Sequence, residues 1–235
     1  MKIIAERNKS DIDVEFLDEY HYIKEHCAIQ NWNNGQIKNP YDRTVFGIGY
    51  VGVGKHKTKI GSKHPPEYCS WQDIIERCHV KERKALHPAY YGISECCQTW
   101  LDYQVFADWY NEHQYNINER IHVDKDLKFP GNKIYSPQHC ILLPQSLNAM
   151  VINVPNKRGL PNGIFYSKGL YIAKYNNEKL GRFDNLYEAF DVRAKAKEDA
   201  IKQKANELKY ILPDEVYQTV MNYKVLIEND KNYVA

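Results

Sequence analysis

Short apolar runs separated by turn residues open the chain. Alternating apolar and polar positions in DVEFLDEYHYIKEH are typical of half-buried strands. A second run, AIQNWNNGQIKNPYD, contains Asn34-Gly35, a dipeptide that favours a tight hairpin turn. We predict a small β module over residues 1–45.

The pattern becomes helical after Glu67. Apolar residues recur at i, i+3, i+4 and i+7 and so share one helical face: Trp71, Ile74, Ile75 and Cys78. An aromatic-rich stretch over about residues 99–112 predicts a second helix whose side chains pack against the first. Residues 46–115 are therefore interpreted as a glycine-rich loop followed by a helical lead-in to what comes next.

Residues 116–155 alternate between strand and helix patterns. RIHVDKD reads as a strand, a loop follows with Pro130-Gly131-Asn132 and Ser136-Pro137, HCILLP reads as a second strand, and a short helix begins near Gln145. The order strand, loop, strand, helix is the prediction for this segment.

The last third predicts a sheet and two helices. GIFYSK, GLYIAKYNN and EKLGRFD are three strand-like runs with tight turns between them. A long helix follows, with Asn185 and Glu188 in capping-box spacing and an apolar stripe at Leu186, Phe190, Ile201, Ala205 and Leu208. We expect this sheet and helix over residues 156–210 and a final amphipathic helix within 211–235, its core EVYQTVMNYKVLIE. The fold class is α+β.

Composition limits the partners that the chain can have. With 235 residues, two or three small modules are expected, and 43% hydrophobic and 26% charged residues are typical of a soluble protein. No apolar run approaches the ~18 residues of a membrane span. The six cysteines form no C-x-x-C pair and no apolar N-terminal run is present, so we expect a reducing, cytoplasmic setting, in a bacterial host if the chain is phage-encoded.

Positive charge is gathered in one loop, although the net charge is only +2. The segment GVGKHKTKIGSKH contains Lys55, Lys57, Lys59 and Lys63 and no acidic residue. On charge alone, Lys55, Lys57 and Lys59 are candidate DNA contacts, and a solvated loop is the alternative.

Candidate chemistry gathers in the strand-loop-strand-helix segment. His122 and Asp124 lie two apart, on one face of the first predicted strand, while Lys125 points to the other face unless the strand ends there. His139 opens the second strand and Asn148 lies on the helix that follows. Carboxylate and amide oxygens suit Mg²⁺, with Mn²⁺ as the second choice, and a divalent cation can assist phosphodiester hydrolysis.

Three runs in this segment, H-V-D-K-D, G-N-K-I-Y-S-P-Q-H-C-I-L-L-P and S-L-N, resemble the phage-type HNH endonucleases, whose core is a ββα-metal unit. The resemblance implies that Asp124 and Asn148 are metal ligands, that position 125 is the general base, and that position 139 is the middle Asn. Lys125 and His139 depart from this pattern.

The departure at Lys125 leaves the general base open. A lysine with an ordinary pKa of ~10.4 is protonated at neutral pH and cannot accept a proton from water. His122 or His139 could act as the base, Lys125 could be a phosphate clamp or a base of lowered pKa, or the site could be inactive. Imidazole has the suitable pKa, so we favour a histidine.

The C-terminal runs G-I-F-Y-S-K, Y-I-A-K-Y and L-G-R-F-D-N-L-Y-E-A-F resemble the plant ethylene-response-factor DNA-binding domain, which also occurs in homing endonucleases. That resemblance implies a sheet in the major groove of DNA. Its contacts would be Arg158, Lys168, Lys174, Lys179 and Arg182. The first strand lacks the arginines expected there, so we expect mostly phosphate contacts and a steep loss of affinity with salt.

The expected function is a divalent-metal-dependent endonuclease of double-stranded DNA, of the homing kind. The alternative is an inactive HNH-fold protein that binds DNA as a regulator or counter-defence factor. RNA binding or cleavage is a third hypothesis. The sequence leaves open the target site, the number of strands cut, the oligomeric state and the role of the N-terminal module.

Overall fold

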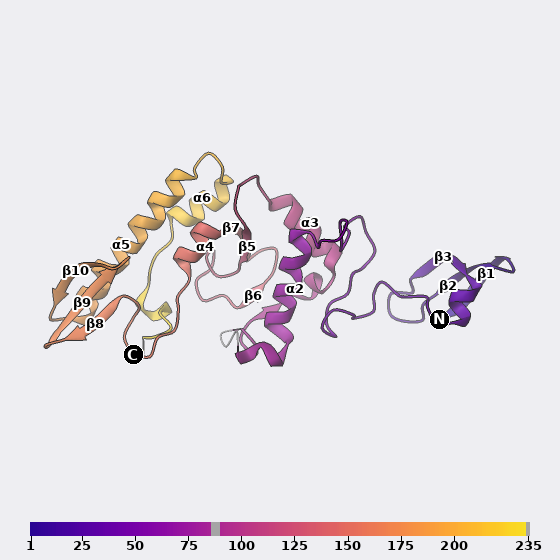
Figure 1. The fold of residues 1–235 in the computed structure, drawn as a ribbon, viewed down its shortest axis with the longest axis horizontal. Coiled ribbons are helices and arrows are strands. Elements are labelled where there is room, and N and C mark those ends of the chain that lie inside the picture. The colour runs from indigo at the N-terminus through magenta and orange to yellow at the C-terminus, as the bar shows by residue number, and fades with distance from the viewer. Residues whose placement is uncertain (86–89, 234–235) are drawn as a thin grey trace. The chain divides into compact units, whose positions relative to one another are not determined.

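The computed structural model describes residues 1–85 and 90–233 (Figure 1). The chain divides into two compact units, an N-terminal unit of Met1–Gly92 with Cys96–Asp108 and a C-terminal unit of Ile93–Glu95 with Trp109–Ala235. Helices and small antiparallel sheets alternate along the chain, which is the predicted α+β class. None of the described helices combines the length and apolar character needed to cross a bilayer.

The N-terminal unit begins with a three-stranded antiparallel sheet, in the segment where a small β module was predicted. Its strands are β1 (Lys2–Asn8), β2 (Asp11–Glu15) and β3 (Ile23–Ala28), in that order. Alternation along β2 directs Ile12 and Val14 into a small core. Few apolar residues are buried in this sheet, so its hydrophobic core is small.

The hairpin predicted at Asn34-Gly35 is wrong. The preceding residues form a short helix, α1 (Ile29–Asn33), and Asn34 is its C-cap. Gly35 has φ +63° and its N–H donates to the Trp32 carbonyl, which is how a helix commonly ends at a left-handed glycine. The same dipeptide thus terminates a helix, because the residues before it are helical and not extended.

The helical lead-in is built around α2 (Pro66–His79) and α3 (Tyr103–His113). Trp71, Ile74, Ile75 and Cys78 are buried, as the periodicity predicted. The Trp71 indole N–H donates to the Trp100 carbonyl at 2.7 Å. The second helix starts later than predicted, because residues Gln98–Leu101 form a 3₁₀ turn. Asp102 precedes the helix and accepts a hydrogen bond from the Gln104 N–H at 2.8 Å. Another 3₁₀ turn, Lys81–Ala85, follows α2.

The C-terminal unit contains a hairpin followed by a helix. Strand β5 (Ile121–Asp124) pairs antiparallel with β7 (Ile141–Pro144), and α4 (Gln145–Val151) follows β7 directly. The loop between the strands includes the short β6 (Ile134–Tyr135), and Glu95 of β4 (Glu95–Cys96) donates to the Lys133 carbonyl. The predicted order of strand, loop, strand and helix is therefore present.

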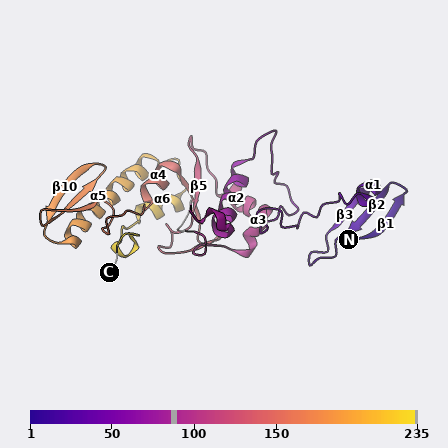
Figure 2. The same ribbon diagram turned by 60° about the horizontal axis from the view of Figure 1, so that its bottom comes forward.

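A second antiparallel sheet follows, of β8 (Ile164–Ser167), β9 (Leu170–Tyr175) and β10 (Glu178–Phe183), and the long helix α5 (Leu186–Glu207) packs on one face of it (Figure 2). Ile164, Ala173 and Ala189 form the core between sheet and helix. The Asn185 side chain caps α5 by accepting from the Tyr187 N–H at 2.7 Å, as predicted.

The final helix is shorter than predicted. Helix α6 covers only Asp214–Met221, and Asn222 is its C-cap. The chain then runs extended, with the Val225 N–H donating to a Glu198 carboxylate oxygen of α5 at 2.9 Å, before a short 3₁₀ turn at Ile227–Asn229. Helices α4, α5 and α6 share one apolar core with the hairpin: Leu127, Ile141, Leu143, Leu147, Ile201, Ala205, Leu212, Val216 and Val220.

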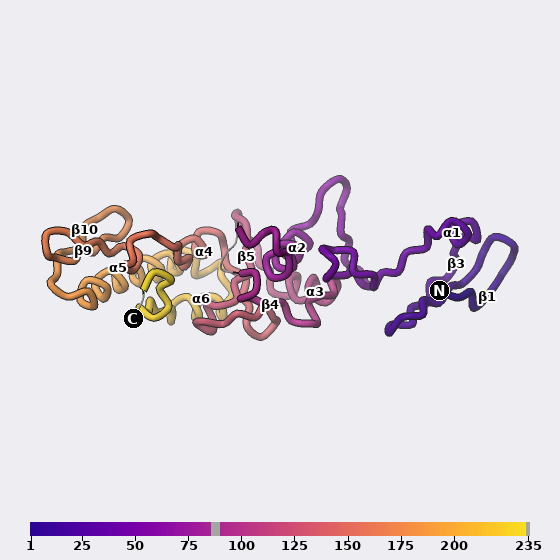
Figure 3. The backbone as a smooth tube through the Cα atoms, turned by 90° about the horizontal axis from the view of Figure 1, so that it is seen from below, coloured from indigo at the N-terminus to yellow at the C-terminus, as the bar shows by residue number. Residues whose placement is uncertain are grey.

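The tail after α6 is tied to the linker between α4 and β8. Buried Asp230 accepts from the Asn162 N–H at 3.0 Å, and the Asn232 amide donates to the Val154 carbonyl at 3.2 Å. Figure 3 traces the tail, in yellow, beside this linker. These contacts fix the C-terminal tail to the linker between α4 and β8.

Candidate functional site

Asp124 is the last residue of β5 and organises the turn after it. Its Oδ1 accepts hydrogen bonds from the Asp126 N–H at 3.1 Å and the Leu127 N–H at 2.8 Å. Such an Asp turn forms where a strand ends and the next backbone N–H groups have no ladder partner. Oδ2 makes no hydrogen bond or ion pair within the described part of the chain, so one carboxylate oxygen remains for a ligand.

The environment of Asp124 opposes its negative charge. The pKa of this carboxyl group is raised to about 6, mainly by burial and secondly by the neighbouring Asp126 carboxylate, while the two backbone N–H donors and Lys125 act in the opposite direction. A carboxylate held at such a cost favours a cation beside it, which would relieve the unfavourable charge.

Lys125 is buried, with 7% of its surface exposed. Its Nζ lies 3.1 Å from an Asp126 carboxylate oxygen and 5.8 Å from the centroid of the Tyr135 ring. Its carbonyl accepts from the Asn132 amide, which closes the loop. These contacts hold the Lys125 side chain against the loop.

The two candidate histidines lie in different settings. His122 is on β5, opposite Leu143, and shares the face of Asp124 because side chains alternate along a strand. His139 precedes β7, so it is not in the strand as predicted; its Nδ1 lies 2.6 Å from the Ser136 hydroxyl and its ring meets the edge of Phe129. No hydrogen bond or ion pair joins His139 to Asp124 among the residues that the structure describes.

Asn148 lies on α4, half-buried, and its side chain takes part in no hydrogen bond of the described chain. Within residues 1–85 and 90–233, no three His, Cys, Asp or Glu side chains come close enough to hold a metal ion. Mg²⁺ nevertheless needs only one or two carboxylates, because it keeps several of its waters. An unengaged Asp124 oxygen and an unengaged amide are the donor types that such an ion accepts.

A basic and apolar surface covers the face of the β8–β10 sheet opposite α5. The strand register places Phe165, Ile172 and Arg182 in one row across the sheet, and Lys174 directly opposite Lys179. Ala173 points toward α5, so its strand neighbours Ile172 and Lys174 point to the opposite face of the sheet. We call this surface the sheet face.

Two cations sit on the Phe165 ring of the sheet face. The Arg158 guanidinium carbon is 4.6 Å and the Lys174 Nζ 5.2 Å from the ring centroid. Lys168 lies in the tight β8–β9 turn, with φ +53°. No carboxylate within the described residues forms an ion pair with any of the five predicted contacts, which are exposed: Arg158, Lys168, Lys174, Lys179 and Arg182.

Residues 52–64, which we call the lysine loop, are anchored at their base. The buried Gln104 accepts from the His56 N–H at 2.9 Å and donates to the His56 carbonyl at 3.0 Å. Lys55 is paired with Asp108 at 3.0 Å, whereas Lys57 and Lys59 are exposed and form no ion pair with a described carboxylate. The loop therefore presents Lys57 and Lys59 from a fixed base, while the charge of Lys55 is partly compensated.

The sequence prediction missed a buried cation pair on α5. Arg193 and Lys197 are 8% and 5% exposed, and burial lowers the pKa of both. The nearby Asp230 carboxylate is hydrogen-bonded to Asn232 and Asn162 instead. The sequence did indicate that Lys197 is buried, because this residue falls within the apolar stripe of the helix between Phe190 and Ile201.

Comparison of the chain with protein-family models, with curated proteins and with solved structures gave no match. The case for any function therefore rests on the residues of this chain.

Proposed function

We propose that this protein binds double-stranded DNA through the sheet face of its C-terminal unit. The observation that carries the proposal is the cross-strand pair Lys174–Lys179. Like charges directly opposite one another destabilise a sheet, and no described carboxylate relieves them. A polyanion that lies along the face would supply the missing negative charge.

The chemistry of the sheet face fits DNA. A sheet of two or three strands can enter the major groove, where lysine and arginine contact phosphates and guanine edges. Only Arg182 projects a guanidinium from the strands themselves, so most contacts would go to phosphates. We therefore expect weak sequence preference and an affinity that falls steeply with salt.

Fluorescence anisotropy of a labelled duplex, titrated with the protein at several salt concentrations, tests this proposal. Replacing Lys174 and Lys179 by Gln should lower the affinity and make the slope of log K against log salt shallower by about 2, because two phosphate contacts are lost. The control is the double replacement of Lys195 and Lys204 by Gln, which removes the same charge from α5. Equal losses in both double variants would rule out the sheet face, and preferential competition by RNA would favour the RNA hypothesis.

A second candidate function is metal-dependent hydrolysis of the DNA backbone. The observation that favours it is the hairpin β5–β7 followed by α4, with Asp124 at the end of the first strand and Asn148 on the helix. This is the ββα arrangement that the resemblance to HNH endonucleases implies. Asp124 Oδ2 and the Asn148 amide would hold Mg²⁺, which when bound supplies positive charge to the scissile phosphate.

The protein's own groups would then position water and transfer protons. His122 shares the face of Asp124, and His139 is oriented by the Ser136 hydroxyl, so one of the two imidazoles would accept the proton from water. Lys125, held by Asp126, would keep the loop in place.

Nicking of supercoiled plasmid in Mg²⁺ or Mn²⁺ tests the second candidate. We expect Asp124→Ala to abolish nicking, and the replacement of whichever histidine is the base to slow it by 10²-fold or more. Lys195→Ala, at an exposed position on α5 outside this donor set, is the control. If wild-type protein binds DNA without nicking it, the chain is a DNA-binding protein on an inactive ββα scaffold.

A further inference from the structure

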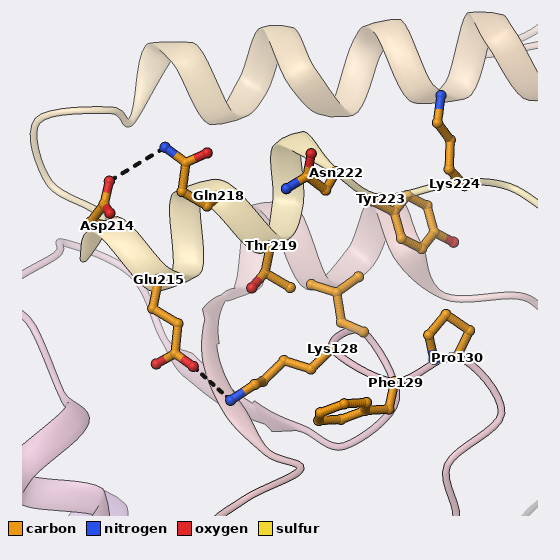
Figure 4. A pocket seen from close by; sticks show the side chains of 11 residues that line it. Lys128, Phe129, Pro130, Asp214, Glu215, Gln218, Thr219, Asn222, Tyr223 and Lys224 are labelled. Atoms are coloured by element: carbon orange, nitrogen blue, oxygen red, sulfur yellow. Dashed lines mark hydrogen bonds and ion pairs between the residues drawn. The ribbon is translucent and has the colours of Figure 1, made fainter.

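A hollow of about 580 Å³ opens beside the Asp124 turn, within the C-terminal unit (Figure 4). One wall is the loop of residues 127–130, which follows Asp124 after two residues, and the other is α6 with the first residues after it. Its volume lies in the range of small-molecule sites. The residues that matter for its chemistry are Lys128, Phe129, Glu215, Thr219, Asn222 and Tyr223.

The loop wall of the hollow presents one aromatic side chain, Phe129. Phe129 is 50% exposed, and its ring is held at an angle of 72° to the His139 ring, with the centroids 5.3 Å apart. Tyr223, which follows the α6 C-cap Asn222, also lines the hollow (Figure 4). A large phenyl ring left half-exposed and held by a neighbour offers a flat surface on which another ring can stack.

Polar groups without partners lie on the α6 side. Neither the Thr219 hydroxyl nor the Asn222 amide forms a hydrogen bond within the described chain. Together they offer both donors and acceptors. Lys128 and Glu215 are paired at 2.6 Å, so this end of the hollow carries no net charge (Figure 4).

These features select the occupant. The lining carries two carboxylates, Asp214 and Glu215, and two ammonium groups, Lys128 and Lys224, so it has no excess positive charge to select a free phosphate. A flat ring with a polar edge does fit, since it can stack on Phe129 while Thr219 or Asn222 bonds its edge. The loop that carries Phe129 follows Asp124 along the chain, so the hollow lies beside the candidate site.

We propose that this hollow receives an unpaired nucleobase, so that the protein prefers DNA with a bulged or single-stranded nucleotide over intact duplex. The inference rests on the proposed DNA binding and deepens it by naming the substrate class. Stacking of one base on an aromatic side chain changes affinity by roughly 5- to 150-fold. The preference for bulged DNA should fall within that range.

The test compares anisotropy titrations of an intact duplex with those of the same duplex carrying one bulged nucleotide. Wild-type protein should bind the bulged duplex at least about 5-fold more tightly. Phe129→Ala should reduce its affinity to that for intact duplex, and Phe129→Leu, which keeps the apolar volume, should do the same. Tyr210→Ala is the matched control, because Tyr210 is an exposed aromatic residue of this unit outside the hollow, and it should leave both affinities unchanged.

Two failures are distinguishable. If wild-type protein binds both duplexes equally, or if Phe129→Ala weakens both by the same factor, the hollow does not hold a base, while DNA binding itself stands. If neither duplex is bound at low salt, the proposed DNA binding fails, and the base site fails with it.

Discussion

Lys197 should make the protein more stable at alkaline than at neutral pH. The pKa of this ammonium group is lowered to about 8, against 10.5 for an exposed lysine, mainly by burial and secondly by the charge of Arg193, while Asp230 partly opposes both. The folded state therefore binds fewer protons than the unfolded state between these two values. Stability is lowest below pH 8 and rises as the pH goes from 8 toward 10.5.

The magnitude follows from the two pKa values. A difference from 10.5 to about 8 corresponds to about 3 kcal/mol of unfavourable charge burial at pH 7. By pH 9.5 the folded state has lost most of that proton, and the free energy of unfolding should have increased by about 2 kcal/mol. The side chain is 5% exposed, so solvent screening is small.

Urea unfolding followed by circular dichroism at pH 7 and pH 9.5 measures this change. Lys197→Met should be more stable than wild type at pH 7 and should lose the rise of about 2 kcal/mol. Lys195→Met, an exposed position on the same helix, should keep it. The reasoning would be refuted if Lys197→Met and wild type showed the same dependence on pH.

Three further predictions concern single side chains. Asp124→Asn should raise the melting temperature at pH 7 in the absence of divalent metal. Above its raised pKa of about 6 the Asp124 carboxylate is charged at a cost in stability, whereas the asparagine carbonyl oxygen is neutral and can still accept the hydrogen bonds of the turn. An unchanged melting temperature would contradict this prediction. Gln104→Ala should cost about 1–3 kcal/mol in denaturant unfolding, because it leaves backbone groups of the lysine loop unpaired, whereas exposed Gln203→Ala should cost little. Asn185→Ala should cost about 1 kcal/mol by removing the cap of α5, and Asn185→Asp should restore most of that in the same measurement.

The sequence predicted best those elements whose signals are local. The strands β8–β10 are bounded by tight turns at Lys168-Gly169 and Asn176-Asn177, which have positive φ as such turns require. The start of α5 was marked by its cap at Asn185. Each of these depends on residues within a few positions of one another.

What the sequence did not predict depends on contacts between distant residues. Helix α6 stops at Met221 because the following segment bonds to Glu198 on α5, although its apolar periodicity continues. Asn34-Gly35 ends a helix because the residues before it became helical. Lys197 falls within the local apolar stripe of α5, but its proximity to Asp230, 33 positions further along the chain, follows only from the tertiary fold.

For the candidate site, the sequence predicted the order strand, loop, strand, helix, but it extended the first strand to Asp126, whereas β5 ends at Asp124. It did not show that Lys125 is tied to Asp126, nor that His139 lies before β7 with Ser136 as its partner. Side-chain partners in a loop depend on how the loop closes, here through the Asn132 amide on the Lys125 carbonyl. The metal, the general base and the activity remain predictions.

The asparagine contacts between the tail and the linker after α4 have a geometric consequence for any cleavage reaction. Asp230 and Asn232 fasten residues 154–162, so the sheet face and the ββα hairpin belong to one body and not to two domains on a tether. If the proposed DNA binding and cleavage are right, the distance between the sheet face and the ββα hairpin is fixed. Cuts would then fall at a constant number of base pairs from the DNA bound at the sheet face, and loosening the tail by Asp230→Ala would scatter them.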